Sequence, residues 1–135
     1  MNETLAKERF VRMRKDMVLD IEALLEEARA SKHREAYKTL DRGLSYRIGV
    51  GARFESPDNY SLFIEILIYL CPASGNLDLK ALGKSLACLK ELEKRGYSLT
   101  CQDGECVSCE ITVSTGRLAE EYFAVKSLMK GVLNS

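Results

Sequence analysis

The apolar residues in the first part of the chain recur at steps of three and four, the period of an amphipathic helix. Over residues 3–30 this stripe consists of Phe10, Met13, Met17, Ile21, Leu24 and Ala28. A second helical stretch extends from about Lys32 to Arg42, where Ser31 can cap its start and Gly43 its end. The pattern therefore predicts a long N-terminal helix followed by a shorter helical segment.

The period changes to strict alternation at Tyr46, which predicts a half-buried strand over residues 46–54. Its second face carries Arg47, Gly49, Gly51 and Arg53. A polar loop at residues 56–59 follows. Residues 62–71 are then apolar on both faces apart from Glu65, which is typical of a strand in the middle of a sheet.

The second half of the chain predicts a helix, a pair of short strands and a last helix. Asn76 can cap the first of these helices, which ends at Gly96 and has a stripe of leucines at positions 79, 82, 86, 89 and 92. The strands cover residues 97–101 and 105–114. Thr115 then caps the last helix, whose inner face consists of Leu118, Tyr122, Val125 and Met129.

These elements predict a single α+β domain over residues 1–135, with the order α-β-β-α-β-β-α and a long N-terminal helix. Strands that are joined as hairpins pair antiparallel. We therefore expect a four-stranded antiparallel sheet packed by helices.

The charge balance lowers the expectation of a nucleic-acid partner, because 20 basic and 20 acidic residues cancel. The longest apolar run, residues 66–71, is far shorter than the roughly 18 residues of a membrane span. The charged N-terminus does not read as a secretory signal. We therefore expect a cytoplasmic protein without a membrane segment, whose five cysteines are thiols or metal ligands rather than disulfides.

Three cysteines form the one recognisable motif, because Cys101, Cys106 and Cys109 have the spacing C-x4-C-x2-C with Gly104 between the first two. This motif resembles the cluster-binding loop of plant-type [2Fe–2S] ferredoxins, and the helix and strands around it are similar to a β-grasp ferredoxin. The resemblance implies an iron–sulfur cluster. That family supplies a fourth cysteine downstream, whereas none follows Cys109 here. Zinc held by Cys71, Cys101, Cys106 and Cys109 is an equally good metal candidate.

A simple hairpin accounts for the same residues without a cofactor. If Gln102-Asp103-Gly104 is a three-residue loop, Gly104 adopts the left-handed conformation and Leu99 lies opposite Val107. This register directs Cys106 away from the other two thiols. We favour the hairpin and keep the metal site as the alternative.

The first hairpin predicts a binding surface. Matching its apolar faces puts Gly51 opposite Glu65 and Gly49 opposite Leu67, which leaves a strip without side chains on one sheet face. The strip is edged by Arg47, Arg53, Glu65 and Tyr69. Either a helix packs into it, with Glu65 paired to an arginine, or it forms a groove for a small acidic ligand or a partner peptide.

The sequence does not identify a biochemical function. No nucleophile, base and orienting group can be assembled from these residues, so we expect a non-enzymatic protein-interaction or ligand-binding module. A helix of about 28 residues would be about 40 Å long and overhang a domain roughly 35 Å wide, which favours a homodimer that covers its stripe. The architecture also resembles the α/β domains of secretion chaperones, which dimerise and hold partner segments. The alternative function is a small zinc or [2Fe–2S] protein.

Overall fold

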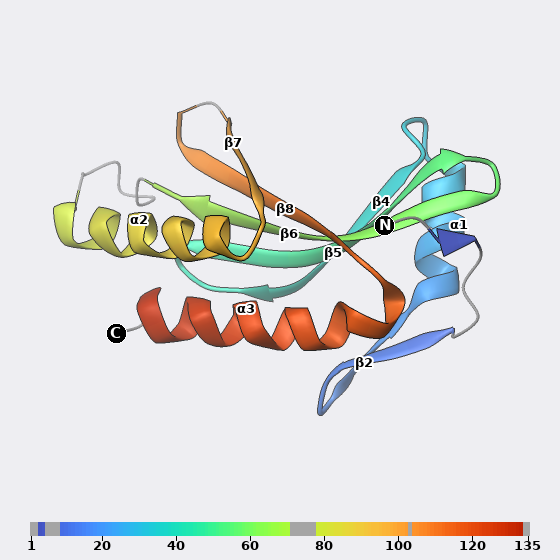
Figure 1. Ribbon diagram of the computed structural model, residues 1–135, viewed down its shortest axis with the longest axis horizontal. Coiled ribbons are helices and arrows are strands. Elements are labelled where there is room, and N and C mark those ends of the chain that lie inside the picture. The colour runs from blue at the N-terminus through green and yellow to red at the C-terminus, as the bar shows by residue number, and fades with distance from the viewer. Residues whose placement is uncertain (1–2, 5–8, 71–77, 103, 134–135) are drawn as a thin grey trace.

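The computed structural model describes residues 3–4, 9–70, 78–102 and 104–133, which form the helices and strands labelled in Figure 1. In chain order these are β1 (Glu3–Thr4), β2 (Phe10–Arg14), β3 (Met17–Asp20), α1 (Ile21–Ala30), β4 (Glu35–Arg42), β5 (Tyr46–Ser56), β6 (Asn59–Tyr69), α2 (Leu79–Lys94), β7 (Ser98–Gln102), β8 (Cys106–Val113) and α3 (Leu118–Leu133). A 3-10 turn, η1 (Thr115–Arg117), precedes α3.

The main sheet has six strands rather than the predicted four. Its order is β4-β5-β6-β8-β7, and β1 adds to β6 outside this path. All pairs are antiparallel. The class is α+β as expected, and β6 is central as its two apolar faces predicted, but the predicted order α-β-β-α-β-β-α is wrong.

The long N-terminal helix is also wrong, because β2 and β3 form a separate two-stranded hairpin and only α1 is helical. Arg14 pairs with Met17 across the turn at residues 15–16. Met13 and Leu19 are buried, one on each strand. Asp20 is the N-cap of α1, and its carboxylate accepts a hydrogen bond of 3.1 Å from the Ala23 N–H. This bond lowers the pKa of Asp20.

The second predicted helix, residues 32–42, is instead the edge strand β4. Ser31 ends α1 rather than starting a new helix. Ala36 and Leu40, four residues apart, fit a helical stripe, but both are buried in a strand that pairs with β5 along its length. Pairing with a neighbouring strand thus decides the structure of a segment whose local pattern was ambiguous.

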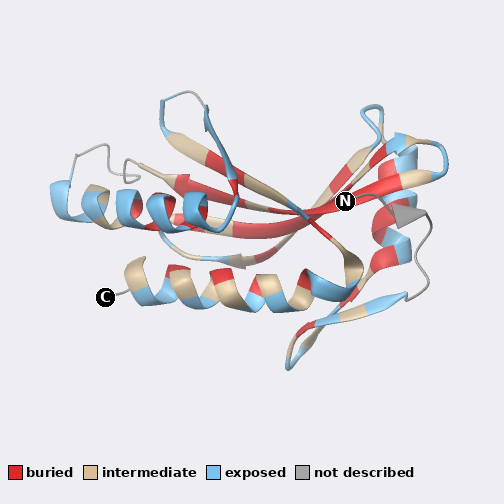
Figure 2. Ribbon diagram, viewed as in Figure 1, coloured by how far each residue is buried: buried red, intermediate tan, exposed pale blue. Residues whose placement is uncertain are grey.

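One face of the main sheet carries the hydrophobic core, which appears red in Figure 2. All three helices contribute buried side chains to this cluster, including Leu24 of α1, Leu92 of α2 and Tyr122 of α3. The inner face predicted for α3 is confirmed, since Leu118, Tyr122, Val125 and Met129 are all buried. No helix within the described residues is long and apolar enough to cross a membrane.

Candidate functional site

The second face of the main sheet carries the four binding residues predicted from the sequence. Gly49 pairs with Glu65 and Gly51 with Phe63, a shift of two residues from the expected alignment. The shift arises because Phe54 pairs with Tyr60 and a bulge follows at the turn. A shift of two preserves the face, so Arg47, Arg53, Glu65 and Tyr69 all project from the side opposite the core strand residues.

The strip above the two glycines is filled by aromatic rings from neighbouring strands. A Cβ atom added at Gly49 would collide with the Tyr37 ring and lie 2.6 Å from the Lys38 carbonyl oxygen. A Cβ atom added at Gly51 would collide with the Phe63 ring. The glycines therefore make room for rings of β4 and β6, and the interpretation in which a helix packs into the strip is wrong.

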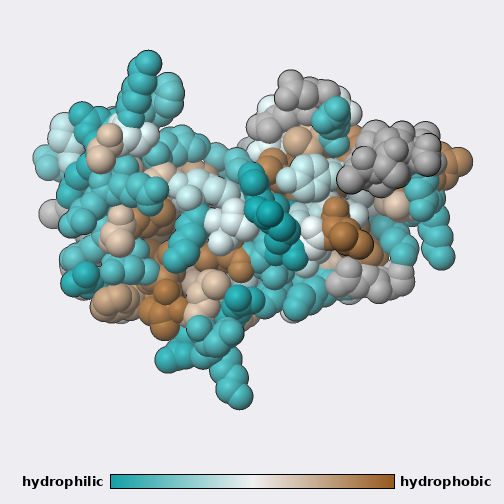
Figure 3. Space-filling view, turned by 180° about the vertical axis from the view of Figure 1, so that it is seen from behind, coloured by the Kyte–Doolittle hydropathy of each residue, from teal (hydrophilic) through white to brown (hydrophobic). Residues whose placement is uncertain are grey.

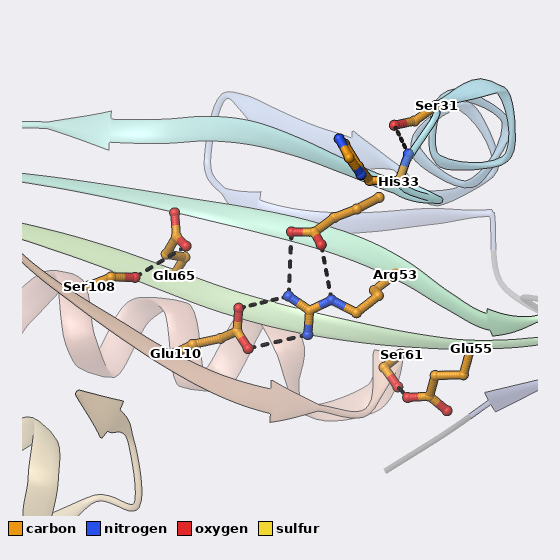
Figure 4. Close-up of polar contacts among 9 residues, drawn as sticks. Ser31, His33, Arg53, Glu55, Ser61, Glu65, Ser108 and Glu110 are labelled. Carbon is orange, nitrogen blue, oxygen red and sulfur yellow. Dashed lines mark hydrogen bonds and ion pairs between the residues drawn. The ribbon is translucent and has the colours of Figure 1, made fainter. Parts of the chain in front are cut away.

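Arg53 is the centre of a charged cluster that spans three strands (Figure 4). Its Nε and Nη2 donate to Glu35 of β4 at 3.0 and 3.3 Å. Its Nη2 and Nη1 donate to Glu110 of β8 at 3.0 and 3.3 Å. The guanidinium lies over the Phe63 ring. The hydrogen bonds that Arg53 donates to Glu110, and then those to Glu35, raise the pKa of Arg53, so its guanidinium stays charged.

Glu65 lies next to this cluster in a partly buried position. Its carboxylate accepts a hydrogen bond of 3.2 Å from the Ser108 hydroxyl, and burial raises its pKa. The Tyr37 hydroxyl donates to the Glu65 carbonyl oxygen at 3.3 Å. Burial raises the pKa of Tyr37 to about 12, so this phenol stays protonated.

Arg47 and Tyr69 lie at the same side of the sheet with fewer contacts. The Arg47 guanidinium is 5.6 Å from the centroid of the Tyr37 ring, and its buried Nε has no hydrogen-bond partner within the described residues. Tyr69 ends β6 and is half-buried. Sequence reasoning missed Glu35 and Tyr37 because their strand was interpreted as a helix. The alternation of Glu35, Tyr37 and Thr39 was the available signal.

The cysteine motif does not gather its thiols on one face. Leu99 pairs with Cys109 and Cys101 with Val107, two residues away from the predicted register. Cys101 and Cys109 therefore share the core side of the sheet, and Cys106 projects from the other. Gly104 has the predicted left-handed conformation, with φ of 72°. Cys71 lies outside the described residues, among which no three His, Cys, Asp or Glu side chains form a metal-binding group.

Two of the thiols are part of the core. Cys88 of α2 and Cys109 of β8 are fully buried. Burial raises the pKa of Cys88 to about 11 and that of Cys109 to about 12. A protonated, buried thiol is a poor nucleophile. The structure thus assigns Cys88 and Cys109 to packing.

Helix α2 exposes part of its leucine stripe. Its buried residues are Ser85, Cys88, Leu89 and Leu92, whereas Leu79 and Leu86 of the predicted stripe are 74% and 50% exposed. The helix starts at Asp78, which caps Lys80 and Ala81, and the predicted cap Asn76 lies outside the described residues. A groove of about 570 Å³ lies between α2 and β7, lined by Gly83, Leu86, Ala87, Leu89, Lys90, Glu93 and Leu99. These seven residues define the α2–β7 groove.

Comparison of the chain with protein-family models, with curated proteins and with solved structures finds no match.

Proposed function

We propose that this protein is a non-enzymatic interaction module that acts as a homodimer, in which a second copy of the chain covers the α2–β7 groove. The observation that carries the proposal is the outward position of Leu86 beside the exposed Leu99. An apolar groove on a helix and a sheet edge is stabilised by removal from water. The long N-terminal helix that first suggested a dimer does not form, so the proposed contact does not involve it.

The charges at the groove favour a second copy as the occupant. Lys90 and Glu93 both line it, and neither forms an ion pair with another described residue. A twofold axis brings the same patch of both chains together, so Lys90 of one copy can face Glu93 of the other. Such a patch is complementary to itself without any net charge, which is the requirement of an isologous interface.

The glycine at position 83 is further support for a second copy of the chain as the occupant of the groove. It lies in the interior of α2, where glycine is less favourable than alanine by about 1 kcal/mol, yet a Cβ atom there would have no heavy atom within 4 Å. No neighbour in the described chain therefore requires a glycine at this position. Close approach of a second helix explains it, because a missing side chain lets two helix backbones come together.

The polar face of the sheet is the surface that we assign to a protein or peptide partner. Arg47, Arg53, Glu65 and Tyr69 remain its candidate contacts, and Tyr37 and Glu110 join them. The absence of enzymatic activity is part of the proposal, since Arg53 is neutralised by two carboxylates and Tyr37 stays protonated. A cytoplasmic location is also proposed, because the thiols of Cys88 and Cys109 are unpaired.

Light scattering on a sizing column tests the dimer. We expect twice the chain mass of 15.2 kDa at micromolar concentration. Leu86→Glu should give monomer because it places a charge in the groove. Lys90→Glu should weaken the dimer by like-charge repulsion, and the double variant Lys90→Glu/Glu93→Lys should restore it.

Two matched variants control for exposure and for an alternative interface. Leu44 is 104% exposed and lies outside the groove, so Leu44→Glu should leave the dimer intact. Val18 of the hairpin β2–β3 is 46% exposed, and apolar side chains gather above the tip of this hairpin when the molecule is seen from behind (Figure 3). Loss of the dimer in Val18→Glu but not in Leu86→Glu would contradict the proposal, as would a monomeric wild type.

A further inference from the structure

A second cavity is lined by residues at the C-terminal end of α1 and at the turn between β5 and β6. Helices α1 and α2 lie at opposite ends of the molecule (Figure 1). The cavity has a volume of about 340 Å³, within the range of small-molecule sites, and it is lined by Arg29, Arg34, Phe54, Glu55, Ser56 and Pro57. The phenyl and pyrrolidine rings supply an apolar wall, and the arginines and Ser56 supply donors. The cavity is separate from both surfaces discussed above.

The two arginines of this cavity are held in place without neutralisation. The Arg29 guanidinium lies 4.8 Å from the centroid of the Phe54 ring. Nη1 of Arg34 donates to the Arg29 carbonyl oxygen at 2.7 Å, which satisfies the C-terminal end of α1. Neither guanidinium forms an ion pair with any described carboxylate.

The carboxylate of Glu55, the acidic residue of the cavity, is already engaged. It accepts a hydrogen bond from the Ser61 hydroxyl (Figure 4). The Glu55 carboxylate keeps its charge in this hydrogen bond, so two guanidinium groups and one carboxylate line the cavity and leave it one net positive charge. An anion bound in the cavity would be attracted by this net positive charge.

The backbone at Arg34 is the second independent observation. Its φ is 58°, and it is the sole non-glycine residue with positive φ in the described chain. This conformation favours glycine and is disfavoured for a residue with a side chain. Arg34 adopts this conformation with its guanidinium held at the cavity by the hydrogen bond to the Arg29 carbonyl oxygen.

We propose that this cavity binds a small ligand whose oxyanion lies between Arg29 and Arg34 and whose apolar part packs on Phe54 and Pro57. Guanidinium groups bind carboxylate and phosphate oxygens through paired N–H donors, and the Ser56 hydroxyl adds a further donor. Both oxyanions share this chemistry. The apolar wall adds affinity for a ligand that carries a compact ring or alkyl group over the bare ion.

Titration of the full-length protein with phenyl phosphate, benzoate, inorganic phosphate and benzyl alcohol, followed by amide NMR shifts, tests the site. We expect phenyl phosphate or benzoate to shift the amides of Arg34, Phe54 and Ser56 and to bind more tightly than inorganic phosphate. The preference between the two identifies the oxyanion. Benzyl alcohol should not bind. No shift of these amides up to about 10 mM of either aromatic anion would overturn the proposal.

Arg34→Gly separates binding from folding. Glycine relieves the left-handed backbone, which offsets the lost hydrogen bond to the Arg29 carbonyl oxygen, so the melting temperature should stay close to that of the wild type while affinity falls at least about tenfold. Arg29→Met keeps an unbranched side chain over Phe54 and should weaken binding similarly. Arg117→Met, an exposed arginine outside the cavity, is the control and should bind as the wild type does. Unchanged affinity in Arg34→Gly would also overturn the proposal.

Discussion

The guanidinium carbon of Arg53 lies 4.5 Å from the centroid of the Phe63 ring, on the sheet face opposite the core. Phe63 is fully buried although it does not belong to the main core cluster. Arg53 covers the ring and reaches Glu110 beyond it, so one side chain connects β5, β6 and β8. The sheet is thus held together on its polar face as well as on its apolar one.

Replacement of Arg53 should destabilise the fold measurably. Arg53→Met removes two half-exposed ion pairs and a cation–π contact, and we expect a loss of about 1–2 kcal/mol in the free energy of unfolding. Urea denaturation monitored by circular dichroism measures it. Arg117→Met is the matched control, because its pair with Glu120 is exposed and should contribute less than about 0.5 kcal/mol. Equal losses in both variants would contradict the cluster's role.

Substitution of Gly49 or Gly51 by alanine should lower the free energy of unfolding, because the new methyl collides with an aromatic ring. Gly49→Ala should destabilise by about 2–3 kcal/mol, because the new methyl meets the Lys38 backbone as well as the Tyr37 ring. The three atoms nearest to a new methyl at Gly51 all belong to the Phe63 ring, which can shift more easily than backbone, so Gly51→Ala should cost less. In a Phe63→Leu background the cost of Gly51→Ala should shrink. Gly116→Ala, where a Cβ has no neighbour within 4 Å, should be near neutral.

Glu65 should make stability depend on pH in the direction opposite to a salt-bridged carboxylate. Its pKa is raised in the folded state by burial, so the folded protein holds the proton more tightly than the unfolded chain does. Stability from this group therefore falls as pH rises through the folded pKa. Glu65→Gln should stabilise the fold near pH 7 and do so less near pH 4. A larger gain at the acidic end would refute this assignment.

The cysteines should differ sharply in reactivity. Cys101 is exposed, whereas Cys88 and Cys109 are buried and protonated. Brief iodoacetamide treatment of the native protein should label Cys101 and spare the buried pair, as peptide mass spectrometry can measure. Urea should expose all five thiols.

The purified protein should contain little metal. We expect less than about half an equivalent of zinc or iron after anaerobic purification, because Cys106 projects from the sheet face opposite Cys101 and Cys109, whereas a site of three or four thiolates would hold one equivalent. Near-stoichiometric metal that is lost in Cys106→Ser would contradict this.

The sequence predicted the second half of the fold better than the first. Strand β6 and the inner face of α3 were predictable because each carries a long, consistent pattern. Met13 and Met17, by contrast, fit a helical stripe, and Met13 equally fits an alternation with Val11. Long-range contact decided between the two periods: Met13 is buried in a hairpin that packs against α3. A single sequence does not contain that information.

The candidate surfaces were predicted in part for the same reason. Alternation placed Arg47, Arg53, Glu65 and Tyr69 on one face even though the register was two residues off, because such a shift preserves the face. Glu35 and Glu110, which clamp Arg53, depend on strands that are distant in sequence. The exposure of Leu86 also depends on how α2 rotates against the sheet. Hydrophobic spacing alone did not fix that rotation.

The pairing of β6 with β8 has a consequence for how the chain acquires its structure. The two strands at the heart of the sheet are separated by α2 and β7, so their hydrogen bonds form between segments far apart in the chain. During synthesis the strands β4, β5 and β6 leave the ribosome before β8. The backbone groups of the apolar strand β6 that pair with β8 therefore stay unpaired until β8 has been synthesised. During this interval the nascent chain presents an unpaired strand to other chains. We therefore expect the yield of folded protein to depend on how this edge is protected during synthesis, as well as on the stability of the finished fold.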